Sequence, residues 1–143
     1  MGFIRNIINF AKNKFQQYRS FILFLIIGGI GTIINAGFVY LFVDVFHFYF
    51  MFGAILSLII ALTSNYTMNR IWTFPNSPEN FFFRGLLKYY IASSIGSIIN
   101  LICLFILVQF MNIWIIFGVI ISTSISALWN YFSNKKWTFQ EVK

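Results

Sequence analysis

The chain has 143 residues, of which 59% are hydrophobic and 9% charged, with a formal net charge of +7. A water-soluble domain of this length averages about a quarter charged residues, so the composition excludes a soluble globular domain. Three acidic residues and one cysteine leave little for general acid–base catalysis and exclude a disulfide framework. We therefore predict an all-α integral membrane protein.

Residues 1–18 form the first predicted element, an amphipathic helix. Apolar side chains recur at positions 4, 7, 8, 11, 15 and 18, while cations and amides occupy the opposite face. This pattern predicts a helix that lies on the cytoplasmic leaflet, separate from a membrane domain at residues 19–139. The alternative that the pattern leaves open is docking of this helix onto a partner enzyme.

Four long apolar runs follow, and each is long enough to cross a bilayer. They are Ser20–Val43, Phe50–Met68, Leu87–Phe110 and Trp114–Ser133. At about 1.5 Å per residue, the first run reaches about 36 Å, compared with a hydrocarbon core of about 30 Å. The sequence therefore predicts four transmembrane helices.

The four spans form two copies of one unit, residues 19–74 and residues 84–139. The motif Asn65-Tyr66-x-x-Asn69-Arg70-x-Trp72-Thr73-Phe74 returns later in the chain as Asn130-Tyr131-x-x-Asn134-Lys135-x-Trp137-Thr138-Phe139. The offset that takes Asn65 to Asn130 also takes Gly31 to Gly96, with no insertion between. Because two crossings return the chain to its starting side, the copies are predicted to be parallel repeats about an axis normal to the membrane.

The basic residues predict the orientation of the protein. They precede the first span, surround the central loop and follow the fourth span, whereas residues 44–49 and 111–113 contain no Lys or Arg. By the positive-inside rule, both termini and the central loop face the cytoplasm in a multi-pass cell-membrane protein. Topology and contact with anionic membrane lipids account for the net charge, so no nucleic-acid partner is predicted.

Polar side chains inside the spans are the candidate site. An amide without partners in hydrocarbon costs several kcal/mol, so these side chains must face protein or a hydrated cavity. Interhelical hydrogen bonding and ligand binding both stay open for Asn35 and Asn100, whereas neighbouring cations favour ligand binding for the Asn-x-x-x-Asn pairs. The predicted substrate-binding residues are Asn35, Asn65, Asn69, Arg70, Asn100, Asn130, Asn134, Lys135 and Lys136.

Two further patterns predict how the helices pack and how deep they sit in the membrane, and we assign no ligand binding or catalysis to them. Small residues four positions apart permit close helix contact, and they occur at Gly28/Thr32, Gly53/Ser57, Ser93/Ser97 and Gly118/Ser122. The pairs Trp72/Phe74 and Trp137/Phe139 suit an aromatic belt at the cytoplasmic interface.

Missing groups narrow the function further. No Asp or Glu lies within the four predicted spans, so the carboxylate of a proton- or cation-coupled antiporter is absent. No phosphate-binding loop, catalytic constellation or metal-ligand set can be assembled, so we predict a non-enzyme with no catalytic residue, metal or cofactor. Amides and hydroxyls with cations at headgroup level suit a ligand that carries a phosphate and a sugar on a lipid tail.

At these residues the chain resembles the GtrA-like family, over about Arg19 to Phe139. The resemblance rests on the four-span layout, on Gly31 and Asn35 in the first span, and on the Asn-Arg-x-Trp-x-Phe ending of the second. It implies a flippase for a polyprenyl-phosphate-linked monosaccharide, of the undecaprenyl-phosphate glucose type, in cell-surface polysaccharide or teichoic acid glycosylation. Partner glycosyltransferases would load the lipid inside and use it outside.

One departure from the family ending concerns the cations. The second copy has Lys135 and Lys136 where the first has Arg70, so the halves are not expected to bind phosphate equally, because Arg can be bidentate. The matching depth of the two motifs predicts a headgroup site between the halves.

Two questions stay open at this level. The alternative function is a membrane scaffold that anchors a partner glycosyltransferase. Four short spans enclose little volume, which is compatible with a homo-oligomer, but the sequence sets neither the number of subunits nor the sugar.

Overall fold

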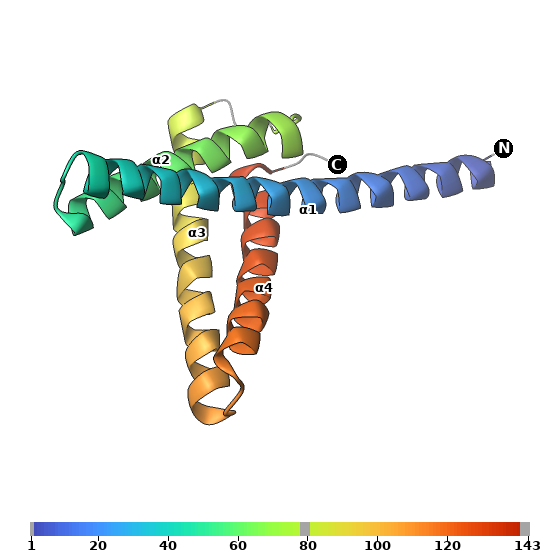
Figure 1. Cartoon of the computed structure of the whole chain (residues 1–143). Helices are drawn as coiled ribbons and strands as arrows, with labels where there is room; N and C mark the ends of the chain where they lie inside the picture. Colours follow the sequence, from blue (N-terminus) through green and yellow to red (C-terminus); the bar gives the residue numbers. More distant parts are fainter. Residues whose placement is uncertain (1, 78–80, 141–143) are drawn as a thin grey trace. The chain divides into compact units, whose positions relative to one another are not determined.

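The computed structural model describes residues 2–77 and 81–140, although not the side chains of residues 2–9, 11–13 and 17. It divides after Pro75, within the predicted central loop, into two compact units (Figure 1). Every regular element in the described residues is helical. The predicted all-α fold is confirmed.

The first unit is a helical hairpin. Helix α1 (Gly2–Tyr40) passes into the π-helical turn η1 (Leu41–Val45), and α2 (Phe50–Met68) returns beside α1 and ends in the π-helical turn η2 (Asn69–Thr73). The 39 residues of α1 reach about 58 Å, so its N-terminal part extends beyond α2 (Figure 1). Its backbone is unbroken near residue 18, and the amphipathic pattern expected for residues 1–18 lies largely outside the described side chains.

The second unit repeats this hairpin with helix α3 (Phe82–Phe105), turn η3 (Ile106–Phe110), helix α4 (Ile115–Ser133) and turn η4 (Asn134–Thr138). From η1 onward, the first and last residues of each element in the first unit are the repeat counterparts of those in the second. The duplication seen in the sequence therefore extends to the ends of the individual helices.

Among the described residues, four helices are long and apolar enough to cross a membrane: Lys14–Val45, Phe50–Thr73, Phe82–Phe110 and Ile115–Thr138. They confirm the four predicted spans, and the second and fourth extend past their predicted ends by the five residues of η2 and η4. The first helix reaches past its predicted end and includes the exposed Asp44, within η1. The expectation of spans without a carboxylate is therefore wrong at this one position.

The loop that closes each hairpin contains one residue in the left-handed region. His47 has φ 54°, and its repeat counterpart Asn112 has φ 51°. Beyond each of them the chain bonds back to its π turn, with the Phe48 N–H donating to the Phe42 carbonyl at 2.9 Å and the Ile113 N–H to the Leu107 carbonyl at 3.0 Å. His and Asn are among the residue types that adopt this conformation most readily.

Replacing His47 with glycine is expected to stabilise the first hairpin by up to about 1 kcal/mol. Relief of a left-handed backbone gains about 1–2 kcal/mol, and the greater freedom of glycine in the unfolded chain offsets part of that gain. Thermal unfolding in detergent measures the effect. The control Phe46→Gly, at φ −89°, should lower stability, and an equal loss in both variants would contradict the assignment.

The interior of each hairpin combines small and polar residues with large, mostly aromatic side chains, and its buried positions repeat. The buried residues are Ser20, Phe24, Ile27, Gly31, Gly53, Ser57, Ala61, Tyr66, Asn69, Thr73 and Phe74 in the first unit, and Gly85, Tyr89, Ala92, Gly96, Gly118, Ser122, Ser126, Tyr131, Asn134, Thr138 and Phe139 in the second. Each buried position in this set has its counterpart in the other repeat. The predicted contacts at Gly53/Ser57 and Gly118/Ser122 are confirmed, whereas Gly28/Thr32 and Ser97 are exposed, so those pairs are not hairpin contacts.

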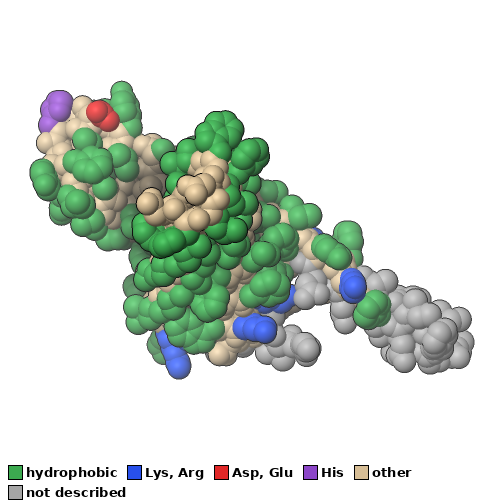
Figure 2. Space-filling model, turned by 90° about the horizontal axis from the view of Figure 1, so that it is seen from below, with side chains coloured by type: hydrophobic (Ala, Val, Ile, Leu, Met, Phe, Trp, Pro, Cys, Tyr) green, Lys and Arg blue, Asp and Glu red, His purple; other side chains and the backbone are tan. Residues whose placement is uncertain are grey.

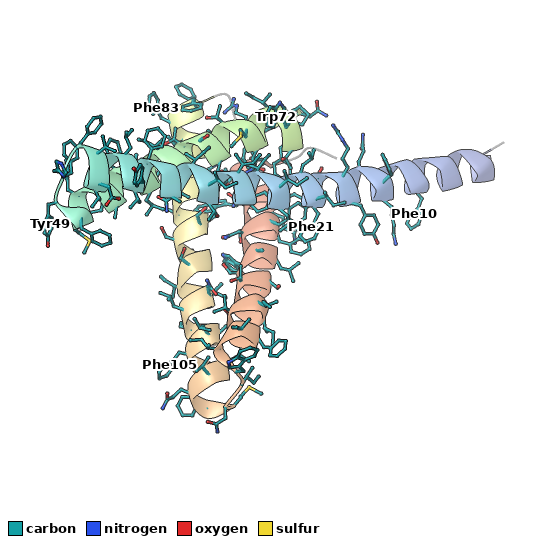
Figure 3. The ribbon with its side chains drawn as sticks, viewed as in Figure 1. Phe10, Phe21, Tyr49, Trp72, Phe83 and Phe105 are labelled. Atoms are coloured by element: carbon teal, nitrogen blue, oxygen red, sulfur yellow. The ribbon has the colours of Figure 1, made fainter. Side chains whose placement is uncertain are left out.

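The outer surface of the protein is predominantly apolar. Hydrophobic side chains cover most of the face drawn in Figure 2. Tyr49 and Trp72 point outward near the two ends of α2, as Figure 3 shows. Trp72 and Trp137 thus fit the predicted aromatic belt, whereas Phe74 and Phe139 are buried and do not. Apolar groups outside and polar groups inside suit hairpins surrounded by hydrocarbon.

Candidate functional site

Asn69 follows the last residue of α2, and its side chain is buried inside the first hairpin. Its Nδ2 donates to the Asn65 carbonyl at 2.9 Å, and its Oδ1 accepts the Thr73 hydroxyl at 2.9 Å. The Asn65 carbonyl also accepts the backbone N–H of Asn69, so the side chain adds a second donor to a carbonyl that keeps its helical bond. The backbone widens at the same point, where the Phe74 N–H donates to the Asn69 carbonyl at 2.8 Å across five residues.

Asn134 does the same at the end of α4. Its Nδ2 donates to the Asn130 carbonyl at 2.8 Å, and its Oδ1 accepts the Thr138 hydroxyl at 2.7 Å. Asn69 and Asn134 are almost fully buried, with 1% and 0% of their surface exposed. These two amides therefore shape the π turns, and their role in ligand binding stays a prediction.

Thr73→Val is expected to destabilise the first hairpin by about 1 kcal/mol, because it leaves the buried Asn69 Oδ1 without this donor at nearly unchanged volume. Thr73→Ser keeps the hydroxyl and should lose less. Chemical unfolding in mild detergent compares the two variants. Equal loss of stability in both would show that the methyl group, and not the hydrogen bond, holds the turn.

A cation is held on a buried tyrosine at the same end of each hairpin, which we call the basic end. Arg70 Nη1 donates to the Tyr66 hydroxyl at 2.9 Å, and Lys135 Nζ donates to the Tyr131 hydroxyl at 3.5 Å. The Lys135 ammonium also lies 5.6 Å from the centre of the Tyr131 ring. Lys135 is therefore the counterpart of Arg70, whereas Lys136 is exposed.

A second pair of amides lies deeper, against glycine. A Cβ atom built on Gly31 would fall 2.5 Å from Asn65 Cγ, and one built on Gly96 would fall 2.6 Å from Asn130 Cγ. Both separations are far shorter than a van der Waals contact. Only glycine leaves room for these amides. The Asn65 amide of α2 therefore packs directly on Gly31 of α1, and the Asn130 amide of α4 packs on Gly96 of α3.

Four amide oxygens in these interiors lack a donor. The Oδ1 atoms of Asn35, Asn65, Asn100 and Asn130 are buried and have no hydrogen-bond partner among the residues that the structure describes. Asn35 and Asn100 follow the two glycines by one helical turn on the same face. The interhelical bond that the sequence left open for Asn35 and Asn100 is thus not made by their Oδ1 atoms in the described part. Each hairpin holds two acceptors without a donor.

The nine predicted residues therefore fall into three groups. The acceptor amides are Asn35, Asn65, Asn100 and Asn130; the turn-forming amides are Asn69 and Asn134; the cations are Arg70, Lys135 and Lys136. In each unit, the acceptor amides and the cation belong to the same hairpin. A headgroup site between the halves stays a prediction.

Sequence reasoning missed the tyrosines and threonines that support these groups. Tyr66 and Thr73 stand four residues before Arg70 and four after Asn69, on the same helix face. Both belong to the repeated motif, so the i to i+4 spacing was available as a signal.

Comparison with known proteins bears on the same residues. The family model of the GtrA/DPMS transmembrane domain matches residues 23–141. The chain is also 30% identical over 105 residues to a dolichol-phosphate mannosyltransferase of Pyrococcus furiosus. That alignment covers 73% of this chain and 29% of the relative, so the chain spans less than a third of the length of that protein.

The family match covers the second repeat, all but the first four residues of the first, and all three groups of candidate residues. Together with four helices of membrane-spanning length, it identifies a multi-pass membrane protein. The resemblance noted in the sequence is confirmed: the chain belongs to the GtrA/DPMS transmembrane-domain family.

Proposed function

We propose that this protein moves a polyprenyl-phosphate-linked monosaccharide, of the undecaprenyl-phosphate glucose type, across the cell membrane for polysaccharide or teichoic acid glycosylation. The observation that carries the proposal is the set of buried amide oxygens without donors, Asn35, Asn65, Asn100 and Asn130. Membership of the GtrA/DPMS family supports handling of polyprenyl-phosphate sugars in general.

The amide oxygens match the main energetic obstacle to such transport. Each sugar hydroxyl that enters hydrocarbon without a partner costs about 2–7 kcal/mol. A buried amide oxygen without a donor carries a penalty of about 1–3 kcal/mol of its own. A hydrogen bond from the sugar to an Asn Oδ1 removes both penalties, so the hairpin interior lowers the barrier for the headgroup.

The cations at the basic end suit the phosphate of the same ligand. Arg70 and Lys135 can form charge-assisted bonds to phosphate oxygens, and each is steadied by a buried tyrosine. Arg70 follows Asn65 by five residues, about 7.5 Å along the helix. That separation lets one ligand present its phosphate to the cation and its sugar to the amide. With the basic end cytoplasmic, loading occurs from the inside.

Transport is proposed to be uncoupled, and the protein is proposed not to be an enzyme. The carboxylate within the described spans, Asp44, is exposed in η1 near the closing loop, away from the amides of the interior. Consumption of the lipid-linked sugar on the outer face then supplies the direction. Proton or cation coupling would call for a carboxylate or a histidine among the buried residues.

Reconstitution tests the proposal. Proteoliposomes should expose polyprenyl-phosphate glucose, loaded on one leaflet, to an external enzyme or chemical probe faster than protein-free vesicles of the same lipids. The rate should not depend on an imposed proton or sodium gradient. Equal rates with and without protein would contradict the proposal.

The second candidate is a scaffold that holds a glycosyltransferase at the membrane. It is favoured by one observation: the relative from Pyrococcus furiosus is named a mannosyltransferase and is much longer than the region it shares with this chain. A scaffold should co-purify with a transferase and should tolerate Asn65→Leu. Loss of glycan decoration with normal synthesis of the lipid-linked sugar would exclude this role.

A further inference from the structure

The two hairpins differ at one buried position beside the amide–glycine contact. In the second hairpin, the Ser126 hydroxyl donates to the Gly96 carbonyl at 2.7 Å and so ties α4 to α3. Gly96 is the residue on which the Asn130 amide lies. The equivalent position in the first hairpin is Ala61, which is buried but has no hydroxyl. The first hairpin therefore lacks this bond across its own amide–glycine contact.

The first hairpin has a cross-helix bond elsewhere. The Ser20 hydroxyl donates to the Thr73 carbonyl at 3.5 Å, which is long for a hydroxyl donor, and this bond lies at the basic end. The counterpart of Ser20 is Gly85, which cannot form it. The cross-helix hydrogen bonds of the two hairpins thus lie at different positions along the helices: in the first hairpin beside the cation, in the second beside the amides.

We propose that the two amide pairs are used unequally: Asn35 and Asn65 take up the hydroxyl groups of the ligand, while Ser126 keeps the second hairpin closed around Asn100 and Asn130. This inference rests on the proposed function and assigns the sugar-binding step to one half of the protein. The ligand must supply hydroxyl donors, because the unpartnered atoms are amide oxygens, which only accept hydrogen bonds.

The physical reason is access. The Oδ1 atoms are buried, so the paired helices must separate or rotate before a hydroxyl can reach them. In the second hairpin, that movement has to break the Ser126 bond. Hydrogen bonds between membrane helices shift such equilibria by a factor of about 3 to 20. The first hairpin opens at its amides without that cost.

Exchanging the two side chains tests the inference. In the wild type, Asn65→Leu should slow transport in proteoliposomes at least about threefold more than Asn130→Leu. In the double variant Ala61→Ser/Ser126→Ala, the order should reverse. Ser124→Ala serves as the control, since Ser124 is exposed and bonds only within its own helix, to the Ile120 carbonyl. Equal effects of the two Leu substitutions in both backgrounds would overturn the inference.

A second readout does not depend on transport. Hydrogen–deuterium exchange in lipid nanodiscs compares residues 58–66 with residues 123–131. In the wild type, exchange should be about 3- to 20-fold faster in residues 58–66 than in residues 123–131. In the double variant, residues 123–131 should exchange faster. Addition of polyprenyl-phosphate glucose to the wild type should slow exchange in residues 58–66. Identical rates, or protection confined to residues 123–131, would overturn the inference. Absence of transport by the wild type would overturn the proposed function instead, and the exchange rates would still decide whether the first hairpin takes up the lipid.

Discussion

Gly31→Ala is expected to destabilise the first hairpin by about 1–3 kcal/mol and to slow transport at least about tenfold. The new methyl group would occupy the space of the Asn65 amide, which lies directly on Gly31. Either the helices move apart or the amide leaves the hairpin interior, and both changes remove the proposed acceptor from its place. Thermal unfolding and the proteoliposome assay measure the two effects.

Two matched variants separate packing from function. Gly28→Ala lies on the same helix with nothing within 4 Å of the added Cβ, so stability and transport should be close to wild type. The double variant Gly31→Ala/Asn65→Ala removes the overlap and should recover stability without recovering transport. Recovery of transport in the double variant would show that Asn65 acts only in packing.

Arg70→Gln is expected to slow transport by about 10- to 100-fold, the effect of losing a charge-assisted hydrogen bond of about 1.5–3 kcal/mol to phosphate. Lys135→Gln should have a smaller effect, because an ammonium cannot form the bidentate contact of a guanidinium. Initial transport rates of polyprenyl-phosphate glucose at fixed protein density provide the measurement.

Lys136→Gln is the control for the arginine variant, because it removes the same charge from an exposed position. We assign the phosphate contact to Arg70 and Lys135, which are held by buried tyrosines, and not to Lys136. It should change transport less than about twofold, as expected for a solvated surface charge. Retention of transport by Arg70→Lys at a reduced rate would support a phosphate contact. Equal losses for Arg70→Gln and Lys136→Gln would show that the general positive charge of this face, and not a site, is responsible.

Hydrophobic run length and internal repetition were sufficient to predict the fold. Apolar runs of membrane length determine helices because a bilayer leaves backbone groups no other partner. The internal repeat correctly predicted Gly31 and Gly96 as counterparts, and the structure adds a second such pair, His47 and Asn112, in the closing loops. What could not be predicted were the π turns, which depend on a five-residue backbone bond and have no hydrophobic period of their own.

The sequence predicted which residues belong to the candidate site, but not which role each of them has. Asn65 and Asn69 look equivalent in the sequence, as two amides one turn apart beside a cation. Their environments differ because Asn69 finds its partners within its own helix, whereas Asn65 faces a glycine of the other helix, which offers its Oδ1 no donor. Only the packing of α1 on α2 distinguishes them. The contrast between Ala61 and Ser126 is visible in the sequence, but its meaning depends on the Gly96 carbonyl opposite.

The central claim is that amide oxygens replace water around the sugar hydroxyls during crossing. The most direct measurement compares, in the same proteoliposomes, transport of polyprenyl-phosphate glucose with that of sugar-free polyprenyl phosphate, for the wild type and for Asn35→Leu/Asn65→Leu. We expect the variant to lose about tenfold in the rate for the sugar-bearing lipid, while the rate for the sugar-free lipid stays within about twofold. An equal loss for both lipids, or no loss for either, would contradict the account.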